Sequence, residues 1–459
     1  LFSLQVYRHG NRSPTHIYPN DPYKEDAWPQ GLGMLTQKGM RQEYALGKFL
    51  KKRYMEKFKL LNSTYIHKEL YIRSTDVDRC LMSAQTQLNG LYPPRGNQIW
   101  RDNLDWQPIG IHVVPKKDDY LLRPFDYKCP RFLKLREEDK KQPSYINMSL
   151  QYKDMLDYVS EKSGEKTEVS TAFLIRDPLI SEESQNMTLP DWVLNGTTYK
   201  DLGTVGDFSM MWNFNTREKA RLTGGALVGR MIENMKLVLS PPNPKEPVRK
   251  AYLYSAHDTT VSAFLSALQV FDGISPDFSS AAILELFSST KEVLNLSVRV
   301  LYRFGQHVPK ILTLPGCEEF CPLERFIELT ADVIPENVEK ECALEQEKCT
   351  CFKVIDYKVE GCYKDRKGRN DTIFTKTFNT VKGVDRKNPD VEKIFLECKE
   401  LAEKEGYEIF AIQKVNMCVT TASGKVADFK KFGGSKGCIV NKQGLGVGKR
   451  RAANFVYAA

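Results

Sequence analysis

The sequence lacks several features that would each assign the chain to a class of protein. It has no run of about eighteen or more apolar residues, so we expect no membrane-spanning helix. It has no internal repeat and no low-complexity tract, which argues against a repeat protein or a disordered chain. It also has no His-x-x-x-His pair and no carboxylate cluster with the spacing of metal ligands. We therefore expect neither a metal ion nor another cofactor.

The composition is that of an ordinary globular protein. Hydrophobic residues make up 41% and charged residues 27% of the 459 residues. A chain of this length is long for one domain and accommodates two or three. It begins with the apolar segment Leu1–Tyr7, which is typical of a core strand and not of a signal peptide. We expect any signal peptide to have been removed.

Cysteines and glycosylation sequons indicate an oxidising compartment. Ten of the 11 cysteines lie at or beyond Cys129. The triplet Asn11-Arg12-Ser13 also fits the pattern of an N-glycosylation sequon, but we discount it because Pro14 follows it. Together these features predict a secreted, extracellular or lysosomal protein. The sequons that we retain begin at Asn62, Asn147, Asn186, Asn195, Asn295 and Asn370.

The net charge of +9 is unevenly distributed along the chain. Residues 343–459 hold 23 Lys and Arg against 15 Asp and Glu, whereas residues 1–342 hold 44 against 43. The basic character therefore belongs to the C-terminal quarter.

The pattern of apolar residues divides the chain into two parts. Residues 1–342 alternate short apolar runs with helical stretches, which predicts an α/β fold with a central mixed sheet flanked by helices. Residues from about 120 to 220 are mostly helical and polar, which predicts an inserted α-helical subdomain. A charged linker, 343–348, precedes a small disulfide-rich domain at 349–459. Its six cysteines predict three disulfides of undetermined pairing: Cys349, Cys351, Cys362, Cys398, Cys418 and Cys438.

Polar clusters follow three predicted strands directly. The strands are Leu1–Tyr7, Leu70–Ile72 and Ala251–Ser255. Ligands of open α/β sheets bind outside the carboxyl ends of the strands, so we expect these clusters to meet in one cleft. The residues expected there are Arg8, His9, Arg12, Arg79, His257 and Asp258.

This set of side chains suits phosphoryl transfer. A phosphomonoester carries close to two negative charges, and arginine donates forked hydrogen bonds that match phosphate oxygens. A neutral imidazole, here that of His9, attacks phosphorus to form a phosphohistidine that water later hydrolyses. Asp258 is placed to donate a proton to the leaving oxygen, because the charge of the bound phosphate favours its protonated form.

Several segments together resemble one family, the histidine acid phosphatases, in the branch that includes the prostatic and lysosomal enzymes of animals. The resemblance covers residues 1 to about 342. It implies His9 as nucleophile, Asp258 as general acid, and Arg8, Arg12, Arg79 and His257 as phosphate ligands. It also implies a homodimer. The matching segments are Arg8–Pro14, Tyr71–Arg79, Ser255–Thr260, Trp28–Gly31, Leu314–Cys317 and Cys321–Phe326.

The resemblance also bears on the cysteines of the first part. The family has a cysteine near Ser181 and another near Ala281, and both are absent here. The resemblance then leaves Cys129–Cys342 and Cys317–Cys321 as disulfides. Cys80 stays unpaired, and we interpret it as a small buried residue on an apolar helix face.

The C-terminal module loosely resembles WSC-type carbohydrate-binding modules. Its positive charge is concentrated near the end of the chain, which favours a glycan or another polyanion as ligand. A solvated basic face is an equal alternative. The basic residues are Lys425, Lys430, Lys431, Lys436, Lys442, Lys449, Arg450 and Arg451.

The sequence therefore predicts a metal-independent acid phosphatase that acts on phosphate monoesters. Two rivals remain. One is a non-catalytic extracellular binding protein whose basic module carries the function. The other is a phytase, which the near-neutral catalytic part supports little. We expect no nucleic-acid partner.

Overall fold

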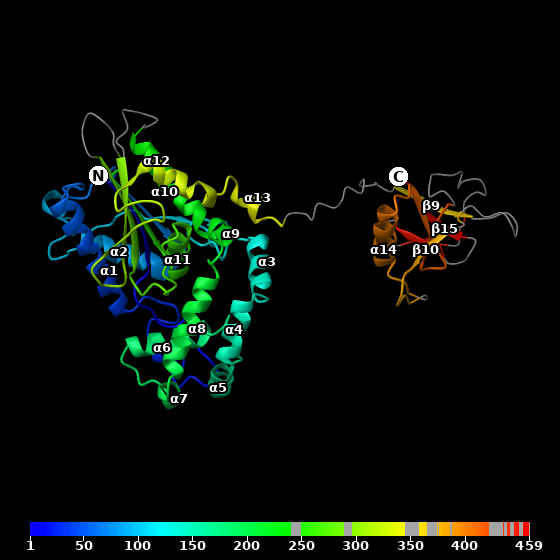
Figure 1. Ribbon diagram of the computed structural model, residues 1–459, viewed down its shortest axis with the longest axis horizontal. Helices are drawn as coiled ribbons and strands as arrows, with labels where there is room; N and C mark the ends of the chain where they lie inside the picture. Colours follow the sequence, from blue (N-terminus) through cyan, green and yellow to red (C-terminus); the bar gives the residue numbers. More distant parts are fainter. Residues whose placement is uncertain are drawn as a thin grey trace. The chain divides into compact units, whose positions relative to one another are not determined.

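A computed structural model divides the chain into two units, Leu1–Leu344 and Glu345–Ala459 (Figure 1). Of the residues named above, Asn295, Asn370, Cys349, Cys351, linker residues 345–348 and the eight basic residues near the C-terminus lie outside the described residues. The structure describes residues 1–239, 249–288, 296–344, 358–364, 374, 376–385, 388–421, 435, 438–440, 445–448 and 453–458.

A mixed β-sheet forms the centre of the first unit. Its strand order is β3-β2-β4-β1-β5-β6-β7, and β8 pairs with β6. The pairs among β3, β2, β4 and β1 are parallel, whereas those from β1 onward to β5, β6 and β7 are antiparallel. The strands are β1 (Phe2–Arg8), β2 (Leu70–Thr75), β3 (His112–Val114), β4 (Ala251–Ala256), β5 (Ala281–Ser288), β6 (Leu296–Arg303), β7 (Lys310–Leu312) and β8 (Cys321–Pro322).

Helices cover both faces of this sheet, so β1 is buried along its whole length. Phe2, Leu4 and Val6 point into one core with α10, α11 and α12, whereas Tyr7 belongs to the core with α1 and α2. This arrangement confirms the predicted α/β class. The covering helices are α1 (Gln37–Leu50), α2 (Asp78–Leu91), α10 (Ala226–Leu239), α11 (Asp258–Ala267) and α12 (Leu323–Thr330), with π-helical turns at Lys51–Lys57 and Arg221–Gly225.

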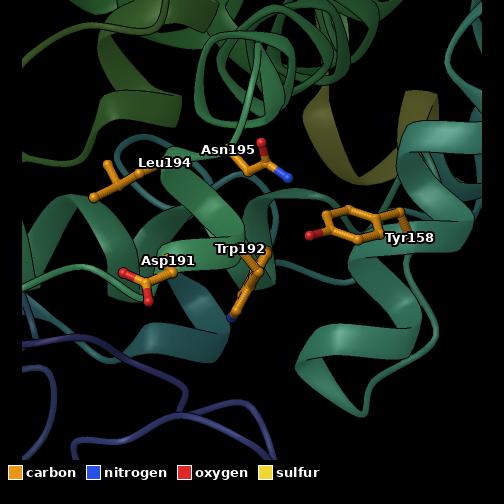
Figure 2. Close-up of a pocket in the computed structure, with 5 residues that line it drawn as sticks. All are labelled: Tyr158, Asp191, Trp192, Leu194 and Asn195. Carbon is orange, nitrogen blue, oxygen red and sulfur yellow. The ribbon is translucent and has the colours of Figure 1, made fainter.

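The predicted helical insert is present and has its own core. Helices α4 to α8 gather in one group at the lower side of the unit in Figure 1, around Leu156, Val159 and Leu179. Between α5 and α7 lies an open hollow of about 450 Å³ (Figure 2). The helices of this region are α3 (Pro130–Asp139), α4 (Pro143–Gln151), α5 (Lys153–Ser163), α6 (Phe173–Ser184), α7 (Asp191–Leu194), α8 (Thr198–Trp212) and α9 (Arg217–Ala220).

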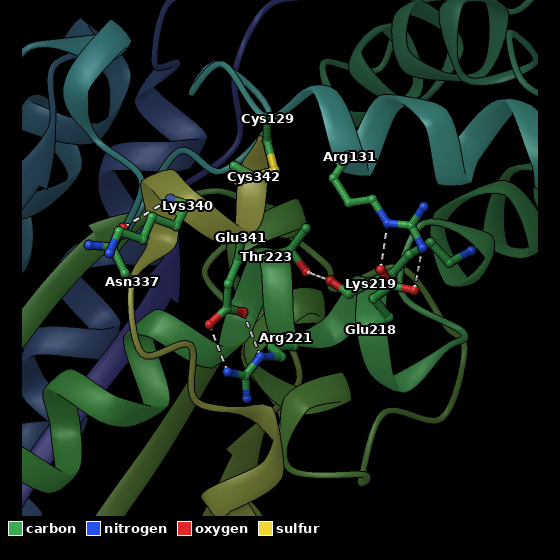
Figure 3. Close-up of a disulfide and its surroundings, with 10 residues drawn as sticks. All are labelled: Cys129, Arg131, Glu218, Lys219, Arg221, Thr223, Asn337, Lys340, Glu341 and Cys342. Atoms are coloured by element: carbon green, nitrogen blue, oxygen red, sulfur yellow. Dashed lines mark hydrogen bonds and ion pairs between the residues drawn. A yellow bond between two sulfur atoms is a disulfide. The ribbon is translucent and has the colours of Figure 1, made fainter. Parts of the chain in front are cut away.

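A disulfide ties the start of the insert to the end of the first unit. Cys129 precedes α3 and is bonded to Cys342 in α13 (Val338–Cys342), 213 residues away (Figure 3). An ion pair between Arg221 and Glu341 supports the same junction. A second disulfide, Cys317–Cys321, closes a short loop. These are the two pairs that the family resemblance implies.

The second unit is a five-stranded antiparallel sheet in the order β10-β12-β11-β15-β9. Helix α14 packs on it through Ile394 and Cys398, and disulfides join Cys362 to Cys438 and Cys398 to Cys418. Its elements are β9 (Lys358–Lys364), β10 (Lys376–Thr380), α14 (Val391–Lys404), β11 (Ile409–Gln413), β12 (Met417–Thr420), β13 (Cys438–Val440), β14 (Gly446–Gly448) and β15 (Ala453–Ala458).

A buried pair of carboxyl groups joins the N-terminal loop to the insert. Asp21 lies in the loop between β1 and α1, Glu182 lies on α6, and their exposed fractions are 2% and 0%. One oxygen of Asp21 and both of Glu182 have no hydrogen-bond donor among the described residues. Burial and the neighbouring Asp21 raise the pKa of Glu182 to about 8. A proton shared between the two carboxyl groups therefore holds these segments together.

We predict that Glu182 makes the fold less stable as the pH rises. Between the pKa of an unfolded glutamate, about 4.3, and about 8, the folded state binds more protons than the unfolded state, so the free energy of unfolding falls with pH. From pH 5 to pH 8 it should fall by about 1 to 3 kcal/mol more in the natural protein than in Glu182→Gln. Urea unfolding at both pH values measures this. The exposed Glu161→Gln is the control, and equal pH dependence in all three proteins would contradict the prediction.

Candidate active site

The carboxyl ends of β1, β2 and β4 meet because these strands are neighbours in the parallel part of the sheet. Arg8 at the end of β1 pairs in register with Ala256 at the end of β4, and the backbone N–H of His9 donates to the Ala256 carbonyl at 3.0 Å. The next residue of the chain after β4 is His257. The rings of His9 and His257 lie 5.5 Å apart, centre to centre.

His9 is buried and is held as one tautomer. Its Nδ1 donates to the carbonyl oxygen of Gly10 at 2.9 Å, and a carbonyl only accepts, so the proton is on Nδ1 and the lone pair on Nε2. Burial lowers the pKa of His9 well below its ordinary value, and Arg79, Arg12 and Arg8 lower it further. The imidazole is therefore neutral, with a free nucleophilic nitrogen.

Two glycines bring α1 against the loop that carries His9. A Cβ on Gly10 would lie 2.4 Å from the carbonyl oxygen of Gly39, and a Cβ on Gly39 would lie 2.1 Å from that of Asn11. Larger residues at either position would separate the two segments. Thr36 caps α1 by accepting from the Gly39 N–H, and its hydroxyl donates to Asn11 Oδ1 at 2.7 Å. The loop is thus anchored on the helix that follows it.

Arg8 links the two strand ends that carry His9 and Asp258. Its guanidinium lies 2.9 Å from Asp258 Oδ2, donates to the Pro276 carbonyl at 2.5 Å and stacks 4.1 Å above the ring of Phe278. Asp258 is the first residue of α11, and its side chain is 24% exposed. Asp258 therefore lies at the more accessible side of the cluster.

Arg12 is oriented by a residue of the helical insert. Its two terminal nitrogens donate to the two carboxylate oxygens of Asp177 at 2.9 and 2.8 Å. Burial opposes the charge of Asp177, but the Arg12 guanidinium outweighs it and holds the pKa of Asp177 below its ordinary value. The bidentate pair fixes the insert against the active-site loop.

Arg79, in the first turn of α2, has no carboxylate partner among the described residues. Its one hydrogen bond goes to the Gly33 carbonyl at 3.4 Å. Burial lowers its pKa, and the nearby charges of Arg12 and Arg123 act in the same direction. A partly buried cation without a paired carboxylate favours an anionic ligand.

His257 is contacted by an arginine that the sequence analysis did not identify. Arg123 Nη1 donates to His257 Nε2 at 2.7 Å, and Thr75 Oγ1 lies 3.1 Å from the same nitrogen. Arg123 also pairs with Asp126. Burial lowers the pKa of His257 well below its ordinary value, and Arg79 and Arg123 add to the effect. His257 is therefore neutral, like His9.

Cys80 lies beneath this site as an unpaired, fully buried thiol. Its Sγ donates to the Ala256 carbonyl at 3.3 Å and lies 3.6 Å from His257 Nε2. Burial raises the pKa of Cys80 to about 11, so it remains a neutral thiol.

The structure thus brings together all six residues expected from the sequence. It adds Arg123 and Asp177, for which no motif or strand end gave a signal. Three of the four arginines pair with carboxylates and Arg79 does not, so the described cluster has one positive charge in excess. In the described part of the chain, no group of three or more His, Cys, Asp or Glu side chains is placed to hold a metal ion.

The chain is similar in sequence to animal acid phosphatases. Human prostatic acid phosphatase is 42% identical over 346 residues, which are 74% of this chain and 87% of that protein. Lysosomal acid phosphatase of Rattus norvegicus is 40% identical over 365 residues, 78% of this chain and 84% of that protein.

The fold is also found among solved structures. The apo form of Hafnia alvei phytase covers 75% of this chain and 98% of its own with a TM-score of 0.57, and at 16% identity this likeness shows the fold alone. Residues 4–303 match the family described as the histidine phosphatase superfamily, branch 2. The chain therefore belongs, with the animal acid phosphatases, to branch 2 of the histidine phosphatase superfamily.

Proposed function

We propose that this protein hydrolyses phosphate monoesters at acidic pH through a covalent phosphohistidine on His9, with Asp258 as general acid. The observation that carries the proposal is the neutral His9 imidazole, whose Nε2 is free while positive charge surrounds it. The names of the relatives, prostatic and lysosomal acid phosphatase, support the same reaction.

In the first step, the phosphoryl group binds among Arg8, Arg12, Arg79 and His257. The lone pair of His9 Nε2 forms a bond to phosphorus while the bond from phosphorus to the ester oxygen breaks. Asp258 gives its proton to that oxygen, so the product leaves as a neutral alcohol. The guanidinium groups stabilise the charge on the equatorial oxygens.

In the second step, water replaces the alcohol. Asp258, now ionised, takes a proton from the water as its oxygen attacks phosphorus. The bond from phosphorus to Nε2 breaks, and inorganic phosphate leaves. His9 returns to the neutral tautomer held by the Gly10 carbonyl. Arg123 contributes by orienting His257, whose Nε2 accepts its hydrogen bond.

We predict that His9→Ala abolishes turnover because no other group takes the place of Nε2. With p-nitrophenyl phosphate at pH 5, kcat should fall by roughly 10⁴-fold or more. Rapid quench of the natural protein with alkali and denaturant, after mixing with ³²P-labelled substrate, should trap an alkali-stable, acid-labile phosphoenzyme that the variant lacks. The exposed His307→Ala serves as control and should keep full activity. Wild-type turnover by His9→Ala would refute the mechanism.

We predict that the effect of Asp258→Asn depends on the leaving group. An amide does not donate the proton that a poor leaving group needs, so kcat for an alkyl phosphate should fall by about 10² to 10⁴-fold. The fall should be much smaller for p-nitrophenyl phosphate, whose leaving group departs unprotonated. Steady-state rates over a series of leaving groups measure this, with the exposed Asp154→Asn as control. Equal losses across the series would exclude Asp258 as the acid.

The second unit is proposed to bind a glycan or another polyanion. Its excess of Lys and Arg over Asp and Glu, 23 against 15, supports this. The resemblance to WSC-type modules and the homodimer both stay predictions. A secreted or lysosomal location is supported by the disulfides and by the name of one relative, lysosomal acid phosphatase.

We predict that the second unit accounts for binding to heparin. The full chain should be retained on immobilised heparin and should elute with added salt, whereas a chain ending at Leu344 should flow through. Phosphatase activity of the shortened chain verifies that it is folded. Elution of both chains at the same salt concentration would contradict the proposal.

A further inference from the structure

The hollow on the helical insert is lined by one of the glycosylation sequons. Its walls are Tyr158 on α5, Asp191, Trp192 and Leu194 on α7, and Asn195 (Figure 2). Asn195 opens the sequon Asn195-Gly196-Thr197. The atom that would receive a glycan therefore lies at the edge of this open surface hollow.

The backbone holds Asn195 in this position. Its N–H donates to the Asp191 carbonyl at 3.0 Å, and its own carbonyl accepts from Thr198 Oγ1 at 3.1 Å. Its side chain is exposed and makes no hydrogen bond with the described residues. Figure 2 shows its amide nitrogen directed toward the side of the hollow where Tyr158 lies, with Trp192 below. The acceptor nitrogen is thus free and aimed across the hollow.

The walls offer the contacts that a sugar ring uses. Pyranose rings present C–H faces that pack on aromatic side chains, while their hydroxyls bond to carboxylates. Trp192 is held edge-on against Tyr18, with ring centres 6.2 Å apart, and Leu194 is 59% exposed. Covering so exposed an apolar side chain with a sugar ring removes apolar surface from water, which is favourable in free energy. Asp191 supplies a carboxylate beside these apolar groups.

Two of the other described sequons, those at Asn62 and Asn147, differ in their surroundings. Asn62 Oδ1 already accepts hydrogen bonds from the N–H and the hydroxyl of Thr64, at 3.0 and 2.9 Å. Asn147 is exposed on α4, in the same insert, but does not line the hollow. Asn147 therefore provides a matched comparison for Asn195.

We propose that Asn195 carries an N-linked glycan whose first N-acetylglucosamine folds back into this hollow, against Tyr158, Trp192 and Leu194. The glycan comes from a polyprenyl-pyrophosphate-linked oligosaccharide. The Asn195 amide nitrogen forms a bond to the anomeric carbon, the bond from that carbon to the pyrophosphate oxygen breaks, and the amide proton goes to a base of the transferase. The lipid pyrophosphate is the leaving group. The hollow then binds the first sugar of the glycan that is attached to Asn195.

The full chain, secreted from eukaryotic cells, tests this proposal. Peptide mass spectrometry should find glycan on Asn195. Under native conditions, peptide N-glycosidase should release it about tenfold more slowly than glycan on Asn62 or Asn147, equivalent to about 1.4 kcal/mol of protection. Denaturation should remove the difference, and Leu194→Ser should reduce it in the folded protein.

Thermal unfolding gives a second measurement. Asn195→Gln and Asn195→Asp should each lower the Tm, whereas Asn147→Gln should not, since only the first two uncover the hollow. An unmodified Asn195, or release as fast as at the other sites, would overturn the proposal. Binding of added N,N′-diacetylchitobiose to the chain while Asn195 is still glycosylated would also overturn it, because the hollow would then be open to an external sugar. None of these outcomes depends on the phosphatase mechanism.

Discussion

Four arginines place like charges together in a largely buried space beside His9: Arg8, Arg12, Arg79 and Arg123. The rest of the first unit supplies carboxylates that offset the repulsion among them. Burial and mutual repulsion both oppose such a cluster. The histidines contribute no further charge, because burial and the neighbouring arginines lower their pKa values and keep them neutral. The carboxylates that balance the cluster come from separate places: the start of α11, helix α6 of the insert and the segment before α3. These three parts of the chain must therefore be in position before the positive charges of Arg8, Arg12 and Arg123 are each paired with a carboxylate.

Specific hydrogen bonds and an ion pair connect the helical insert to the site. The Arg12–Asp177 pair fixes α6 against the active-site loop, and Asn11 extends the same contact by donating to Ser184 at 2.8 Å. On the other side of the loop, the close contact of Gly10 with Gly39 sets the position of α1. The loop is held between two helices from different layers, which keeps His9 in place without help from a substrate.

The sequence was sufficient for the parts of the fold and site that local pattern encodes. Apolar runs followed by polar clusters located β1, β2 and β4, and the rule that ligands bind at carboxyl strand ends brought His9 and Asp258 together. Other features depend on tertiary contacts and have no local signal. Asp177 stands beside a proline inside α6, and Arg123 is one basic residue in an irregular segment. Only the folded chain brings them to the cluster around His9 and His257.

The shared proton between Asp21 and Glu182 has a consequence for where this protein survives. Near and above pH 8 Glu182 loses this proton, and the loop and the insert are joined least firmly. As the pH falls the joint strengthens, so the protein becomes more resistant to unfolding and to the proteases that attack unfolded chains. Its resistance to digestion therefore increases with the acidity of its surroundings.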